Sequence, residues 1–120
     1  MQRTFLLAGS LVGFVGVAFG AFGAHGLRGR LSPEMLAVFE TGVRYQMYHA
    51  LALMLVAAAA ARIESRLVSA AGWLFVTGIV LFSGSLYLLA VTGITVLGAV
   101  TPIGGVAFLA AWACLAIATL

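Results

Sequence analysis

Four apolar stretches dominate this chain of 120 residues. Each is close in length to the roughly 20 residues that a helix needs to cross the ~30 Å hydrocarbon core of a bilayer. Hydrophobic residues make up 64% of the chain and charged residues only 8%, against about 25% charged in an ordinary soluble domain. A water-soluble fold would expose large apolar patches. The predicted fold class is therefore all-α: an integral membrane four-helix bundle of one domain, with the lipid bilayer as its solvent.

The predicted spans cover about residues 5–24, 45–61, 67–91 and 102–120. A short amphipathic helical segment, residues 33–44, precedes the second span. Ser32 and Pro33 predict its start, because serine is a good N-cap and proline suits the first helical position. Thr101 and Pro102 repeat that pattern before the fourth span.

Glycines recur along the first span at alternating steps of four and three: Gly9, Gly13, Gly16, Gly20 and Gly23. Lipid provides little hydrophobic force between helices, so small residues that let two backbones approach closely favour association. We predict a helix-packing face here, and hypothesise that a second copy or a larger complex docks on it. A glycine-lined pore is the alternative. A cleaved signal peptide is a rival interpretation of the first span, but the apolar run is longer than such a segment needs.

The number and spacing of the charged residues suit positions at the membrane surface and do not suit binding to nucleic acid. All six basic residues are arginines, the net charge is +3, and no basic cluster exists, so no nucleic-acid partner is expected. An even number of spans places both termini on one side, which together with the 62–66 turn carries Arg3, Arg62 and Arg66. The other side carries Arg28, Arg30 and Arg44, of which Arg44 lies at the head of a span and counts weakly. By the positive-inside rule we therefore expect cytoplasmic termini, in a bacterial plasma membrane. The single cysteine, Cys114, excludes an intrachain disulfide.

Polar and ionisable residues near a span are candidates for function. The candidates are His25, Glu40, Arg44, Tyr45, Gln46, Tyr48 and His49, together with Ser83 and Ser85 in the third span. Glu40 and Arg44 have the four-residue spacing of a helical ion pair. The first interpretation is a structural cap that fixes how the second helix meets the first and third. A proton or ion relay through His25, Glu40 and His49 is the second.

Those three side chains could also hold zinc if they converged, although the sequence gives no sign that they do. No catalytic triad, metalloprotease motif, phosphate loop or dinucleotide motif is present. We therefore expect no enzyme, no cofactor and no metal.

Four motifs carry a family resemblance: GAFGAHGL (20–27), FETGVRYQMYHALAL (39–53), LFSGSLYLL (81–89) and TPIGGVAFLAAW (101–112). Together they resemble a family of small bacterial inner-membrane proteins known as domain of unknown function 423, or the YgdD/YwdK family. That family is in turn similar to a small eukaryotic transmembrane protein family. The resemblance covers nearly the whole chain. It implies a four-helix integral membrane protein and implies no activity.

Two functional hypotheses follow. The leading one is a structural or interaction protein that forms a homo-oligomer or serves as an accessory subunit of a larger membrane complex. The alternative is a small proton- or ion-coupled transporter or channel that uses Glu40 and His49.

Overall fold

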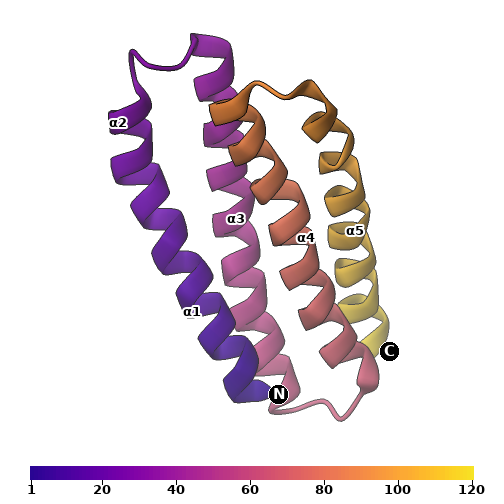
Figure 1. Ribbon diagram of the computed structural model, residues 1–120. Coiled ribbons are helices and arrows are strands. Elements are labelled where there is room, and N and C mark those ends of the chain that lie inside the picture. Colours follow the sequence, from indigo (N-terminus) through magenta and orange to yellow (C-terminus); the bar gives the residue numbers. More distant parts are fainter.

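The computed structural model describes residues 1–120, apart from the side chain of Ala24. Each long helix runs antiparallel to the next one in the chain, and both termini lie at the same end (Figure 1). The described residues form no strand, which confirms the predicted all-α fold. The elements are α1 (Gln2–Ala18), a π-helical segment η1 (Phe19–Gly23), α2 (Ala24–Leu27), α3 (Pro33–Ala60), α4 (Arg66–Thr92), a short 3-10 helix η2 (Thr95–Ala99) and α5 (Thr101–Ala118).

Three helical stretches are long and apolar enough to cross a membrane: Gln2–Leu27, Arg66–Thr92 and Thr95–Ala118. The helix α3 has 28 residues, but polar side chains in its N-terminal half lower its mean hydropathy. The amphipathic segment 33–44 is not a separate helix, because α3 runs through it into the predicted second span without a break.

The helix ends follow local rules in most places. The Ser32 hydroxyl accepts a hydrogen bond from Met35 N at 3.1 Å, as expected of an N-cap. Gly93 ends α4 with φ of 72°, a left-handed conformation that favours glycine. At α5 the prediction was wrong in detail: Val100 is the N-cap and makes no capping side-chain bond. The Thr101 hydroxyl instead meets Ser85 of α4.

The helices pack in chain order, α1 on α3, α3 on α4 and α4 on α5. Figure 1 shows α1 and α5 at opposite edges of the molecule, with α3 and α4 between them. The Cα atoms extend over 49 × 26 × 16 Å, so the four rods form a thin bundle. The two central helices therefore provide most of the positions that are covered by protein on more than one side.

The five glycines of the first span face α3 of the same chain. A Cβ on Gly9 would lie 2.9 Å from Ala50 O, and one on Gly23 would lie 2.9 Å from Phe39 Cζ. Gly16 lies against Met47, and Gly20 lies against Val43. This face is already covered within the chain, so the hypothesis that another protein docks on it is not retained, and neither is a pore there.

A further close approach, which the sequence did not reveal, joins α1 to α4. The fully buried Phe5 ring rests on Gly72, where a side chain would collide with it. Its edge meets Trp73 at a centroid distance of 5.3 Å. Together with Phe75, Leu53 and other buried residues, Phe5 forms the apolar core in the half of the bundle near the termini.

Candidate functional site

Gln46 joins three helices through one side chain. It is 4% exposed, and it lies on the face of α3 that meets both α1 and α4. Its Nε2 donates to Val12 O of α1 at 2.9 Å, and its Oε1 accepts from the Tyr87 hydroxyl of α4 at 2.5 Å. The amide thus has a partner at each end, which an apolar environment requires.

The two serines of the third predicted span bond to different neighbours. Residues two apart on a helix point about 200° apart, so Ser83 and Ser85 face opposite sides of α4. Ser83 Oγ donates to Gly42 O of α3 at 2.7 Å. Ser85 Oγ donates to Phe82 O at 2.9 Å and lies 2.6 Å from Thr101 Oγ1 of α5, which can donate to it. A Cβ on Gly42 would lie 2.8 Å from Tyr87 Cε1, so the absence of a side chain allows this approach.

His49 connects α3 to α5. Its ring stacks on Phe108 with 3.6 Å between centroids and 3° between planes. Trp112 Nε1 donates to His49 Nε2 at 3.3 Å, while Nδ1 lies 2.7 Å from Tyr45 O. Because indole can only donate, Nε2 is the acceptor and Nδ1 carries the proton. The geometry therefore assigns one neutral tautomer with both nitrogens bonded.

These side chains form an interhelical polar network, defined here as Gln46, His49, Ser83, Ser85, Tyr87, Thr101 and Trp112. Within the described part of the chain, every buried side-chain nitrogen or oxygen has a hydrogen-bond partner. The sequence identified Gln46, His49 and the two serines as candidates, but missed Tyr87 and Trp112 and assigned Thr101 to a helix cap. Tyr87 and Trp112 lie in two of the family motifs, and each is an aromatic ring with a polar tip in an apolar span.

The other predicted residues do not join this network. His25 is exposed on α2, and Glu40, Arg44 and Tyr48 are exposed on the outer face of α3. His49 lies 16 residues after Pro33, roughly 24 Å along the helix axis. The relay and the zinc site, which both need His25, Glu40 and His49 together, are not assembled. Among the described residues, no group of three His, Cys, Asp or Glu side chains could hold a metal.

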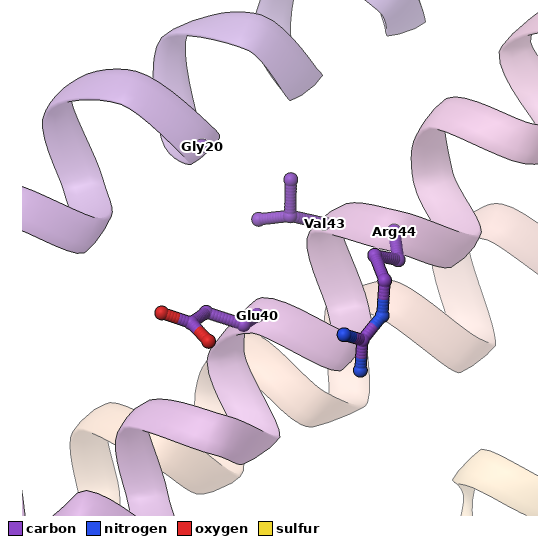
Figure 2. Close-up of a pocket in the computed structure, with 4 residues that line it drawn as sticks. All are labelled: Gly20, Glu40, Val43 and Arg44. Carbon is purple, nitrogen blue, oxygen red and sulfur yellow. The ribbon is translucent and has the colours of Figure 1, made fainter.

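The expected ion pair between Glu40 and Arg44 is not formed. Figure 2 shows the Glu40 carboxylate and the Arg44 guanidinium pointing apart. Arg44 Nη2 donates instead to Thr41 Oγ1 at 3.2 Å, one turn nearer the start of α3. Glu40 and Arg44 are both exposed, so their side chains can adopt rotamers that do not bring them together.

Two hollows open on the flanks of the bundle. The first, of about 280 Å³, lies between the π-helical segment and α3 and is lined by Gly20, Glu40, Val43 and Arg44; we call it the Glu40 notch (Figure 2). The second, of about 480 Å³, lies between α3 and α5 over α4; we call it the aromatic groove. Its lining includes Tyr45, His49, Phe82, Gly105, Leu109 and Trp112.

The aromatic groove was not predicted from the sequence. Its wall on α5 follows positions 102, 105, 109 and 112, a helical row that could have been recognised as one face. What the sequence did not show is which helix lies opposite that face.

Comparison with known proteins places the chain among membrane proteins. The model of the family described as "Protein of unknown function (DUF423)" matches residues 19–105. The UPF0382 membrane protein YwdK of Bacillus subtilis (strain 168) is 49% identical over 118 residues, which cover 98% of this chain and 96% of the relative. The UPF0382 membrane protein SERP0230 of Staphylococcus epidermidis is 48% identical over 119 residues, covering 99% of this chain and 97% of that protein.

No solved structure matches the chain. The family match and the relatives agree with the four motifs and with the apolar helices of the fold. The chain therefore belongs to the DUF423 family and is a membrane protein.

Proposed function

We propose that the protein is a non-enzymatic interaction protein, which assembles with a second copy or with a larger membrane complex through the Glu40 notch. The observation that carries this proposal is an exposed carboxylate on the outer flank of α3. Glu40 makes no ion pair within the described part of the chain, since Arg44 turns to Thr41. A carboxylate at membrane depth is costly and is a functional candidate by default.

The depth of Glu40 follows from the contacts of α3 with α4. Gly42 lies against Leu86 and Tyr87, and its carbonyl accepts from Ser83. This part of α4 lies roughly 8–13 Å before the helix ends at Thr92. The 27 residues of α4 span about 40 Å, against a hydrocarbon core of ~30 Å. Glu40, half a turn before Gly42, is therefore near the boundary of the hydrocarbon region.

The shape of the notch supports a protein partner. The π-helical segment Phe19–Gly23 borders it, and Gly20 contributes no side chain to fill it. A basic side chain from a neighbouring helix would enter this space and pair with the carboxylate. Such an ion pair avoids leaving a single charge in an apolar environment, which would cost several kcal/mol.

A non-enzymatic role is supported by the use of the interior polar groups. The hydroxyls, amide and imidazole of the interhelical polar network bond to one another or to helix backbones. No nucleophile stands beside a free base there. These groups hold helices together, as polar side chains do in membrane bundles.

Native mass spectrometry after extraction in a gentle detergent tests the proposal. We expect the wild-type protein to retain a second copy or a stoichiometric partner, and Glu40→Gln to lose it. Glu34→Gln is the matched control, because Glu34 is also exposed on α3 but lies in the first turn. A wild-type monomer without a partner, or unchanged assembly of Glu40→Gln, would contradict the proposal.

We also propose a bacterial plasma membrane location with cytoplasmic termini. Figure 1 shows both termini and the α3–α4 turn at one end, where Arg3, Arg62 and Arg66 lie. In a Cys114→Ala background, a membrane-impermeant maleimide should label Leu31→Cys in intact cells. It should label Glu64→Cys only after permeabilisation. Labelling of Glu64→Cys in intact cells, and of Leu31→Cys only after permeabilisation, would contradict cytoplasmic termini.

A further inference from the structure

The aromatic groove runs lengthwise along the bundle, on a different flank from the Glu40 notch. On α5 it follows Pro102, Gly105, Leu109 and Trp112, a row that extends roughly 15 Å along the helix axis. A Cβ on Gly105 would meet nothing within 4 Å, so this glycine leaves the wall of the groove open. The groove therefore has the length and direction of a chain that lies parallel to the helices.

The floor of the groove lies at the depth of the hydrocarbon core. Phe82 of α4 lines it, and Trp112 packs against Phe75 with 4.9 Å between ring centroids. Phe75 and Phe82 lie on either side of the middle of α4, which runs from Arg66 to Thr92. A groove at this depth is therefore suited to an apolar occupant that lies along the helices.

Polar groups gather at the end of the groove nearer the start of α3. Thr41, Tyr45 and His49 form one row on α3, and the last two line the groove. Arg44 itself lines the Glu40 notch and not the groove, but its guanidinium is turned towards Thr41 of this row by a hydrogen bond to Oγ1, away from Gly20 (Figure 2). Arginine has five N–H donors, so most remain free after that bond. The Tyr45 side chain is 38% exposed, and its hydroxyl has no partner in the described part of the chain.

Thr41 is adjacent to Gly42, which contacts Tyr87, so the guanidinium lies roughly 8 Å before the end of α4. This is close to the boundary where lipid phosphates and arginine side chains meet. A cation and a free hydroxyl thus stand above a groove that is apolar along its length.

From this arrangement we propose that the aromatic groove is a binding site for one anionic phospholipid. The phosphate pairs with the Arg44 guanidinium, the Tyr45 hydroxyl donates to a phosphate or ester oxygen, and one acyl chain fills the groove down to Trp112. Charge complementarity selects the headgroup, because guanidinium and phosphate form strong charge-assisted hydrogen bonds. The apolar groove favours a lipid over free phosphate as the ligand, because free phosphate has no acyl chain to fill the groove.

The two tryptophans provide the test, because Trp112 lines the groove whereas Trp73 packs on Phe5. The full-length protein is reconstituted in phosphatidylcholine vesicles that contain a rising fraction of phosphatidylglycerol with brominated acyl chains. Bromine quenches tryptophan fluorescence on contact. In Trp73→Phe, we expect Trp112 to be quenched at lower bromolipid fractions than random mixing gives. In Trp112→Phe, Trp73 should follow random mixing.

Two variants locate the site. Gly105→Leu fills the groove and should remove the excess quenching of Trp112. Arg44→Gln should remove the preference for brominated phosphatidylglycerol over brominated phosphatidylcholine. Gly84→Leu is the matched control, since a Cβ there also meets nothing within 4 Å but the residue does not line the groove. Circular dichroism confirms that each variant is folded.

Equal quenching of Trp112 in Trp73→Phe and of Trp73 in Trp112→Phe would overturn the proposal. Excess quenching that survives both Gly105→Leu and Arg44→Gln would overturn it as well. Glu40→Gln should leave the quenching unchanged, so this result is separate from the outcome for assembly through the Glu40 notch.

Discussion

The two faces of α3 hold their neighbours in different ways. Towards α1, the contact is a row of bare glycines against α3, and among the described side chains one interhelical hydrogen bond, from Gln46 to Val12 O, crosses it. Towards α4 and α5, hydroxyl, amide and ring groups bond across the interface. Membrane helices lack a hydrophobic force between them, and this molecule uses both available substitutes, close packing and interhelical hydrogen bonds.

The difference also concerns register. The contact with α1 relies mainly on van der Waals packing against glycines, which is less directional than a hydrogen bond. A bond such as that from Ser83 to Gly42 O, between residues 41 apart in the chain, is made at only one position. The polar side of α3 therefore fixes the alignment of the bundle, while the glycine side provides close contact.

The largest expected effect tests the glycine side. Gly9→Ala should lower the free energy of unfolding by about 1–3 kcal/mol, because the added Cβ would lie 2.9 Å from Ala50 O and the backbones must separate. Gly13→Ala is the matched control: its Cβ would lie 3.8 Å from Ala50 Cβ, an ordinary contact. Steric trapping in bicelles measures both values. Equal losses would show that the seam does not depend on close backbone approach.

A second test removes the residue shared by both sides. Gln46→Leu loses its bonds to Val12 and Tyr87, and we expect a loss of about 1 kcal/mol, given roughly 0.6 kcal/mol for an average interhelical bond in a membrane. Tyr87→Phe removes one of the two bonds and should cost about half as much. A double-mutant cycle with zero coupling would contradict the hydrogen bond between these residues.

The smallest effect separates interhelical bonds from local ones. Ser83→Ala should cost about 0.6 kcal/mol, because its hydroxyl bonds to another helix. The Ser10 hydroxyl bonds to Leu6 O within its own helix, so Ser10→Ala should be nearly neutral. If the two substitutions had the same effect in the same unfolding assay, the polar side of α3 would not differ from the rest of the helix surface.

The fold could be predicted because its signals are local to each helix. Apolar length predicts a span, and Ser32 before Pro33 predicts a helix start, without knowledge of any other segment. The sequence identified polar candidate residues but could not show which of them contact one another. Trp112 donates to His49, 63 residues away, and Arg44 donates to Thr41 and does not pair with Glu40. These pairings depend on helix register and side-chain direction, which the sequence alone does not show.

The chain-order packing of the helices has a consequence for biosynthesis. When α3 enters the membrane, Val12 O of α1 is already present to accept a hydrogen bond from Gln46. When α4 follows, Gly42 O and Gln46 Oε1 of α3 are present to accept from Ser83 and Tyr87. Each arriving helix thus finds its partner in place, so the order of synthesis can also be the order of assembly. His49 on α3 waits longest for its partner, because its indole donor comes with the last helix. Insertion of α5 is the step that completes the bundle.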